Sequence, residues 1–213
     1  MVKVQAAEAE QVKKNNAKLK KGGGIAIMAM IVATLVNEGG YVFHKADPGG
    51  ETNLGITKKV AVQAGYTAPM KQLPKEVAVS IYYQQFIVES GYEKLVDANA
   101  PVVAELFDTA VNMGPARPNR FLQKSLNQVC RINLPVTGKM NLDVQISFEN
   151  CSQSIGPINF CLQMLDALDA QQKAEYDRLV RVNPKLKVFY RGWTSHRINN
   201  VPRSSCKVTY AGI

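Results

Sequence analysis

Two carboxylates flank a glycine-rich segment in the first quarter of the chain. Glu38 follows the uncharged apolar run Ile25–Val36 and is followed at once by Gly39-Gly40. The run predicts a helix buried on all sides, and the glycines predict its end, so Glu38 is expected in the last turn. There the helix dipole and the apolar neighbours disfavour the ionised carboxylate and raise the pKa of Glu38, as a general acid near neutral pH requires.

Asp47 opens the turn sequence Asp-Pro-Gly-Gly, where polar surroundings favour an ionised side chain. Two carboxyl groups whose surroundings separate their pKa values are the working pair of glycoside hydrolysis. The alternative is structural, a solvated Glu at a helix end beside an ordinary turn. A separation of about 5 Å between the two carboxyl groups would predict a retaining enzyme, and one of about 6.5–9.5 Å an inverting enzyme. The sequence does not give this separation, so the retaining and inverting mechanisms both stay open.

Residues 38–57, EGGYVFHKADPGGETNLGIT, resemble the catalytic segment of the bacterial and phage N-acetylmuramidases of glycoside hydrolase family 108. In that family a Glu followed by Gly-Gly-Tyr precedes an Asp-Pro-Gly-Gly-x-Thr-Asn-x-Gly-Ile-Thr sequence. The resemblance implies that Glu38 is the catalytic acid and that Asp47 positions water or stabilises an oxocarbenium-like transition state. The spacing also resembles the wider phage lysozyme pattern. The substrate-binding residues implied for this segment are Tyr41, Thr52 and Asn53.

A second block, Phe107–Pro115, is similar to a helix of the same family that carries an Asp and an Asn and ends in Gly-Pro. Asp108 and Asn112 are four residues apart, so they share one helix face. The resemblance implies that both face the groove and bind substrate; structural hydrogen bonding to the glycine-rich loop is the alternative.

Two short sequences farther along, Phe-Leu-Gln at 121–123 and Gly-Trp at 192–193, resemble the start and end of the family's C-terminal region, a helical and peptidoglycan-binding-like part of the protein. The glycine-rich turn of that region is represented here only by Val136–Met140. Because of this departure, the resemblance does not by itself predict a separate wall-binding role for this region.

Apolar periodicity and capping residues predict helices along most of the chain. Thr57 is a good N-cap for a helix to Ala64, and prolines are expected to open helices at Pro74 and Pro101. Further helices are expected at about 119–130, 141–149, 157–182 and 186–198.

The expected fold class is mainly α, a lysozyme-like helical domain with a short β-like or irregular catalytic loop, followed by a C-terminal helical region. The expected divisions are a basic N-terminal arm and glycine hinge (1–24), the catalytic domain (25–116), the C-terminal region packed on it (117–201) and a basic, extended tail (202–213).

The N-terminal arm is polar and rich in lysine, which predicts a mobile or loosely helical segment on a flexible hinge at Gly22–Gly24. Together with Ile25–Val36 it superficially resembles a signal sequence. The apolar run is short for a membrane span, however, and no small-x-small cleavage site follows it. A core helix is therefore favoured over a releasable N-terminal anchor, and no signal peptide is assigned.

The net charge of +9 favours anionic partners. Nucleic acid is not the expected partner, because the sequence has no nucleic-acid-binding motif and no basic stripe interleaved with aromatic residues. Peptidoglycan is the expected partner, and an anionic membrane or wall surface is a further one for the basic arm. The protein is expected to be a monomer.

Four cysteines lie in the C-terminal half without the close spacing of a zinc site. They allow up to two disulfides in an oxidising periplasm. Taken singly, Cys130 and Cys161 fit buried thiols in helical patterns. With only two histidines, His44 and His196, neither a metal cage nor a catalytic triad is expected, and no metal or cofactor is required.

The function implied by the resemblance is hydrolysis of the β-1,4 bond between N-acetylmuramic acid and N-acetylglucosamine in peptidoglycan. The expected setting is a phage endolysin, made in the host cytoplasm and acting on the wall in the periplasm. A rival from another class is a non-catalytic wall-binding or virion structural protein that keeps a lysozyme-like fold. An enzyme of toxin secretion or wall remodelling would share the chemistry.

Overall fold

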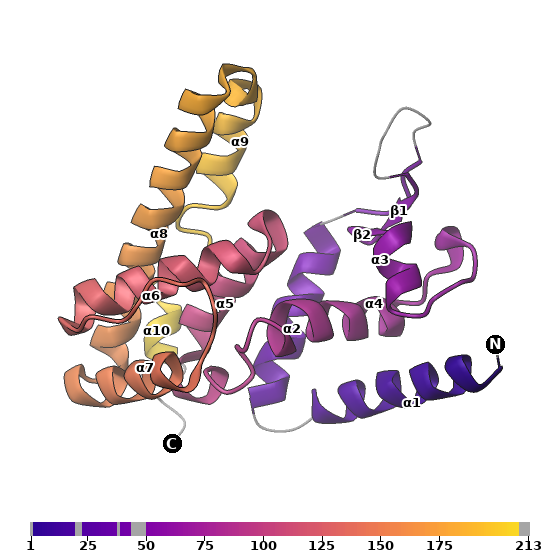
Figure 1. The fold of residues 1–213 in the computed structure, drawn as a ribbon, viewed down its shortest axis with the longest axis horizontal. Helices are drawn as coiled ribbons and strands as arrows, with labels where there is room; N and C mark the ends of the chain where they lie inside the picture. The colour runs from indigo at the N-terminus through magenta and orange to yellow at the C-terminus, as the bar shows by residue number, and fades with distance from the viewer. Residues whose placement is uncertain (1, 20–22, 38, 44–49, 209–213) are drawn as a thin grey trace. The chain divides into compact units, whose positions relative to one another are not determined.

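The computed structural model describes residues 2–19, 23–37, 39–43 and 50–208. Within these residues the protein is mainly α-helical, as expected, and its two strands have two residues each (Figure 1). The chain divides into two compact units, Met1–Glu89 and Ser90–Ile213. The domain division expected between residues 116 and 117 does not coincide with the boundary of these units and stays a prediction.

The first unit contains, in chain order, helices, a strand pair and two short non-α helical turns. They are α1 (Val2–Lys18), α2 (Gly23–Asn37), β1 (Thr52–Asn53), β2 (Ile56–Thr57), α3 (Lys58–Gln63), the 3-10 turn η1 (Met70–Gln72), α4 (Lys75–Tyr82) and the π-helical η2 (Tyr83–Val88). The Thr57 hydroxyl accepts a hydrogen bond from the Val60 amide, which confirms the predicted cap of α3.

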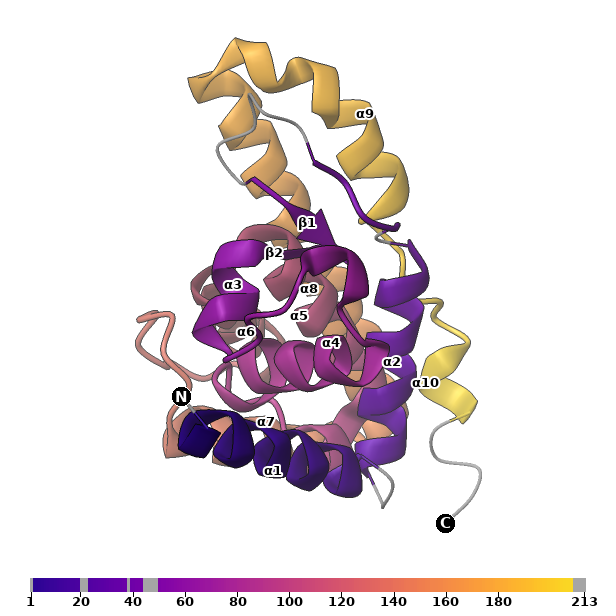
Figure 2. The same cartoon turned by 90° about the vertical axis from the view of Figure 1, so that its right-hand side faces the viewer.

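The N-terminal arm, expected to be mobile or loosely helical, is the helix α1, and it packs on α4 (Figure 2). Asn15 is buried and donates a hydrogen bond from Nδ2 to Ser80 Oγ at 3.0 Å, while Leu19 is only 1% exposed. A Cβ atom on Gly24 would lie 2.2 Å from the Lys18 carbonyl oxygen. Gly24 therefore allows the start of α2 to approach the end of α1 closely. The prediction of a flexible hinge missed this packing role.

Helix α2 is buried along one stripe only, which corrects the expected burial on all sides. Ile27, Ile31 and Leu35, spaced four residues apart, have exposed fractions of 2%, 0% and 9%. Val32 and Val36, expected to face inward, are exposed by 46% and 77%. The sequence of this run hides the difference because it carries no charged residue to mark the solvent face.

In its described residues, the second unit contains helices joined by loops and no strand. It contains α5 (Val96–Met113), α6 (Ala116–Cys130), α7 (Leu142–Ile155), α8 (Pro157–Val182), the 3-10 turn η3 (Pro184–Leu186), α9 (Lys187–His196) and α10 (Ser205–Val208). Helices α5, α6 and α8 pack on one another and form its core. Phe148 of α7 and Phe160 of α8, both 0% exposed, meet edge to face with their ring centroids 4.8 Å apart.

The predicted helix start at Pro101 is preceded by one further turn. The backbone of Asn99 is extended, with φ −163° and ψ 86°, and breaks the helical path inside α5. Asn99 Oδ1 accepts a hydrogen bond from the Val102 amide, so Asn99 caps the helix that continues to Met113. Asn99 Nδ2 also donates to the Pro157 carbonyl at the start of α8, which ties the cap to the core.

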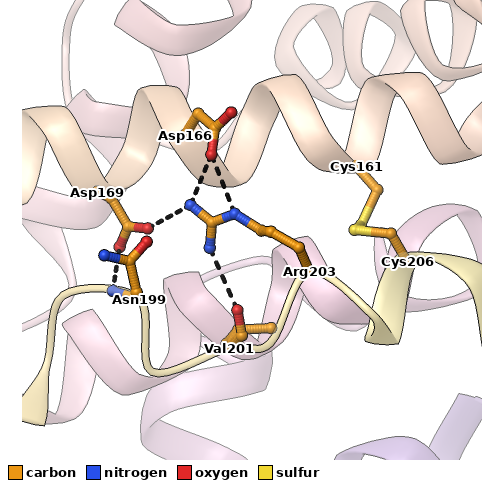
Figure 3. Close-up of polar contacts among 7 residues, drawn as sticks. All are labelled: Cys161, Asp166, Asp169, Asn199, Val201, Arg203 and Cys206. Atoms are coloured by element: carbon orange, nitrogen blue, oxygen red, sulfur yellow. Dashed lines mark hydrogen bonds and ion pairs between the residues drawn. A yellow bond between two sulfur atoms is a disulfide. The ribbon is translucent and has the colours of Figure 1, made fainter.

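The tail, expected to be extended, is held on α8 by a set of contacts called here the C-terminal clasp (Figure 3). Arg203 donates hydrogen bonds to Asp166 at 2.7 Å and to Asp169 of α8. The amide of Asn199 donates to the other oxygen of Asp169 at 3.1 Å. The described tail ends in the short helix α10, which the disulfide Cys161–Cys206 joins to α8.

Both pairs of cysteines form disulfides, Cys130–Cys151 and Cys161–Cys206. The interpretation of Cys130 and Cys161 as buried free thiols is therefore wrong. The first disulfide joins the end of α6 to α7, and the second joins α8 to α10. Each single helix gives no sign of its partner, so the helical pattern on which the thiol interpretation rested could not identify either bridge.

No single helix in the described part of the chain has the length and apolar character needed to cross a membrane. Segments Glu10–Lys18 and Gly23–Val36 meet those requirements only when they are taken together, and they are bent by 111° at the break between them.

Candidate functional site

The segment singled out by its carboxylates begins where α2 ends. Helix α2 runs to Asn37, one residue before Glu38, and Gly39 has a φ of 77°. Glu38 and Asp47, the two expected catalytic residues, lie outside the described residues. The structure therefore shows the elements on either side of them, and both assignments stay predictions.

The β1–β2 hairpin follows the carboxylate-bearing segment. Asn53 pairs with Ile56, and Leu54 and Gly55 form the two-residue turn with φ of 52° and 73°. Two positive φ angles define a type I′ turn, whose twist suits a tight hairpin. A positive φ is unusual for leucine, and the Leu54 carbonyl accepts a hydrogen bond from the Tyr82 hydroxyl of α4 at 3.2 Å.

A backbone bridge joins the two ends of the stretch that contains Asp47. Val42 and Thr52 exchange both backbone hydrogen bonds, at 2.8 and 2.9 Å. Thr52 also pairs with Thr57 of β2, so its backbone lies between Val42 on one side and Thr57 on the other. The amide of Lys58 donates to the Glu51 carbonyl at 2.8 Å and extends the pairing by one step. Thr52, an expected substrate-binding residue, is therefore fixed by its backbone, while its side chain is half-buried.

Glu51 is the centre of a polar network on this hairpin. Its two carboxylate oxygens accept hydrogen bonds from the Tyr41 hydroxyl at 2.9 Å and from Lys58 Nζ at 2.7 Å. Lys71 Nζ lies 5.1 Å from the centroid of the Tyr41 ring. The hydrogen bonds from Lys58 and then Tyr41 lower the pKa of Glu51. Burial, followed by the bond to Glu51, raises the pKa of Tyr41.

Asn53 is buried, and its Nδ2 donates a hydrogen bond of 2.6 Å to the Met70 carbonyl of η1. This contact holds the hairpin against the segment that follows α3. Among the expected substrate-binding residues, the structure therefore brings Tyr41, which precedes the bridged residue Val42, close to the hairpin residues Thr52 and Asn53. Glu51, named in the motif but given no role by the sequence, is the residue that links Tyr41 to the hairpin.

Asp108 and Asn112, the other two expected substrate-binding residues, lie on α5 in the second unit. Asp108 Oδ1 accepts a hydrogen bond from Arg197 at 2.7 Å, and Asn112 Nδ2 donates to the Tyr176 hydroxyl at 3.4 Å. These two side chains thus tie α5 to the residue after α9 and to α8. Burial raises the pKa of Tyr176.

The same face of α5 carries a buried glutamate that the sequence analysis did not single out. Glu105 is 1% exposed, and its pKa is raised well above the usual value by burial and then by the charges of Asp169 and Asp108. Thr109 donates to Glu105 at 3.4 Å and accepts from Gln172 at 2.9 Å. Polar residues at 105, 108, 109 and 112 follow helical spacing, a signal from which this face could have been predicted.

A cavity of about 600 Å³ lies in the second unit beside the Cys130–Cys151 disulfide. Its walls come from the end of α6 and the loop after it, from α7, and from Gln163 of α8. Its polar lining includes Arg131, Ser147 and Asn150. In the part of the chain that the structure describes, no group of three or more His, Cys, Asp or Glu residues is arranged to hold a metal ion.

Among known proteins, a solved structure is similar to most of this chain, and a family model matches part of it. No curated protein matches it. Among solved structures, the structure of Brucella abortus SagA is similar, with a TM-score of 0.60 and 25% sequence identity over 87% of this chain and 95% of that chain. Residues 31–114, which include the whole carboxylate-bearing segment and the hairpin, match the family model of glycosyl hydrolase 108.

Proposed function

We propose that this protein is a peptidoglycan hydrolase of the N-acetylmuramidase type, which cleaves the β-1,4 bond between N-acetylmuramic acid and N-acetylglucosamine. The observation that carries the proposal is the match of residues 31–114 to glycosyl hydrolase 108. That match includes the predicted general acid Glu38, the second carboxylate Asp47 and the β1–β2 hairpin. The two disulfides suit an oxidising compartment and so support the periplasm as the place of action, with a phage endolysin as the proposed setting.

Glu38 is the proposed general acid. Helix α2 ends at Asn37, the residue before Glu38 in the chain, and the partial negative charge of a helix C-terminus would oppose the ionisation of a carboxyl group beside it. A protonated Glu38 would donate its proton to the glycosidic oxygen as the bond to the leaving sugar breaks. Asp47 would stay ionised and either position the attacking water or stabilise the oxocarbenium-like transition state.

The hairpin is the proposed platform for the sugar. Tyr41 and Thr52 are assigned to sugar contacts, and Glu51 holds the Tyr41 ring in place through its hydroxyl. Asn53 is assigned a positioning role, because its amide group is already bonded to the Met70 carbonyl. For Asp108 and Asn112 the contacts with Arg197 and Tyr176 favour a structural role that joins α5 to neighbouring elements of the second unit, which differs from the expected hydrogen bonding to the glycine-rich loop.

The substitution Glu38→Gln tests the proposal, because glutamine keeps the shape of the side chain but has no acidic proton to donate. Release of reducing ends from purified sacculi should fall by at least about 100-fold, the lower range of general acid catalysis, with the circular dichroism spectrum unchanged. Glu76→Gln, the same change at an exposed site in the first turn of α4, is the matched control and should keep full activity.

Mass spectrometry of the digested peptidoglycan identifies the bond. Products that end in reducing N-acetylmuramic acid support the proposal, and products that end in reducing N-acetylglucosamine contradict it. Full activity of the Glu38→Gln variant would remove Glu38 from its role. Binding of the wild-type protein to sacculi without any release of product would favour a non-catalytic wall-binding or virion structural protein.

A further inference from the structure

The connection between α8 and α9 carries three large apolar side chains that are exposed to solvent. Residues 181–191, called here the hairpin tip, join the two helices where they stand clear of the rest of the second unit (Figures 1 and 2). Val182, Val188 and Phe189 of the tip are exposed by 69%, 77% and 55%. Clustered exposed apolar side chains of this size are typical of surfaces that contact a partner.

The hairpin tip is built on a fixed scaffold. Tyr190 donates a hydrogen bond of 2.6 Å to Asp177, which joins α9 to α8. The Trp193 ring stacks between Tyr176 at 5.0 Å and Phe189 at 5.9 Å. Asn183 Oδ1 accepts from the Lys185 amide and caps the turn η3. The packing of α9 on α8 therefore holds these apolar side chains on the surface, and they are not the ends of a frayed helix.

The charge around these apolar residues has one sign. From residue 178 to the end of the chain the sequence contains eight lysines and arginines and no aspartate or glutamate. Four of the cations lie on the hairpin tip, and none of the four forms an ion pair with a described residue: Arg181, Lys185, Lys187 and Arg191. Asp177, just before this stretch, is already bonded to Lys173 and Tyr190.

We propose that the hairpin tip docks on an anionic lipid surface. Exposed valine and phenylalanine side chains surrounded by lysine and arginine are the two components of interfacial membrane binding, apolar insertion and attraction to acidic headgroups. A hydrophilic polyanion, such as a nucleic acid or a teichoic acid, would satisfy the cations but would leave Val182, Val188 and Phe189 in water. The apolar residues thus favour lipid over such polymers. This surface differs from the basic N-terminal arm, which the sequence alone suggested for the same type of partner.

Vesicle binding by the full chain tests this proposal, and the position of the single tryptophan makes the test specific. Trp193 stacks on Phe189 of the hairpin tip, so its fluorescence reports on the environment of that surface. With vesicles of phosphatidylcholine and phosphatidylglycerol, the protein should co-sediment and the emission of Trp193 should shift to the blue. With phosphatidylcholine alone, or at high salt, both signals should largely disappear.

Three double variants separate the charge on the hairpin tip from charge elsewhere on the chain and from apolar contact. Lys185→Gln with Lys187→Gln should lower binding to the acidic vesicles about 25-fold, since each basic residue near an anionic surface contributes about fivefold. Lys59→Gln with Lys139→Gln removes the same charge from exposed positions outside the tip and should lower binding less than about threefold. Val188→Asn with Phe189→Asn tests the apolar part and should lower binding by at least about tenfold at constant charge.

Three results would overturn the proposal. Vesicle binding without any change in Trp193 emission would place the contact elsewhere on the chain. Equal losses in the two lysine pairs would show attraction by net charge alone. Unchanged vesicle binding by the Val188→Asn and Phe189→Asn variant, with equal binding to DNA or teichoic acid, would identify a general polyanion site. None of these variants alters the proposed catalytic segment, so activity on solubilised glycan strands serves as an independent control of folding.

Discussion

Two glutamates of this protein have opposite electrostatic surroundings. Glu51 accepts hydrogen bonds from Lys58 and Tyr41, which lower its pKa and favour the charged form. Glu105 is buried beside Asp169 and Asp108, which raises its pKa and favours the neutral form. The first residue thus gives the hairpin a fixed charge, whereas the second fills a polar position in a core where an ionised carboxylate would be costly.

Glu105 should make the second unit less stable as the pH rises. Burial holds the folded-state pKa of Glu105 well above the usual value of 4.5, so the stabilisation is fully present below about pH 4.5 and is lost as the pH rises toward the folded-state pKa. Glu105→Gln, which is neutral at every pH, should remove this dependence. Urea unfolding at pH 5 and pH 8 should show a decrease in the free energy of unfolding that is larger in the wild type by at least about 1 kcal/mol. Parallel decreases in both proteins would contradict the assignment.

Glu51 should affect catalysis through the position of Tyr41. Glu51→Gln weakens the contacts with both Tyr41 and Lys58, so kcat/KM on solubilised glycan should fall about 10- to 100-fold, as expected when a substrate-binding group is displaced by about 1 Å. Lys58→Gln leaves the Tyr41 bond in place and should cost less activity. If both variants lose the same activity, the ion pair rather than the orientation of Tyr41 matters. Because the pKa of Glu51 is lowered, its contribution is present at neutral pH and is lost only in acid.

The hairpin depends on a turn that only certain residues adopt easily. Gly55 has a φ of 73°, a conformation that is strained in any residue with a Cβ atom. Gly55→Ala should therefore lower the free energy of unfolding by about 1 kcal/mol.

The same substitution at Gly192 is the contrasting control. Gly192 lies inside α9, and a Cβ atom there would meet no atom within 4 Å. Gly192→Ala should raise the stability by up to about 1 kcal/mol, so chemical unfolding of the two variants should move the midpoint in opposite directions.

The elements that the sequence predicted well are those with local signals. Helix α8 begins at Pro157 and ends at Val182 as expected, and Thr57 caps α3. The expected short β-like segment is confirmed in its described part by the β1–β2 hairpin, whose turn at Leu54 and Gly55 contains a glycine. In each case the residues that determine the element lie within it.

The elements that the sequence missed depend on distant partners. The burial of Asn15 in α1 requires Ser80, which is 65 residues away, and the position of the tail requires Asp166, Asp169 and Cys161 of α8. The residues of the candidate site likewise include some that the sequence identified and one whose role depends on a distant contact. The motif identified Tyr41, Thr52 and Asn53, but the role of Glu51 became visible only when the backbone bridge brought it within reach of Tyr41.

In the molecule as a whole, covalent stabilisation is confined to one unit. All four cysteines lie after residue 89, and both disulfides join elements of the second unit. The bridged residues are 21 and 45 positions apart in the sequence. By loop-closure entropy the bridges are worth about 3 and about 4 kcal/mol, respectively. The longer loop includes α9 and the hairpin tip, so Cys161–Cys206 should matter more for the proposed lipid-binding surface.

Reduction of the disulfides should therefore destabilise the two units unequally. Hydrogen exchange with and without a reductant should show faster exchange in α8 and α10, while α3 and α4 of the first unit keep their protection. Cys161→Ser with Cys206→Ser should have the larger effect on the tail, because Arg203 and its two aspartate partners would then hold it alone. Cys130→Ser with Cys151→Ser is the matched control, with one bridge lost and the clasp intact. Equal loss of protection in α3 and α4 would contradict this division, because it would mean that the first unit unfolds together with the second.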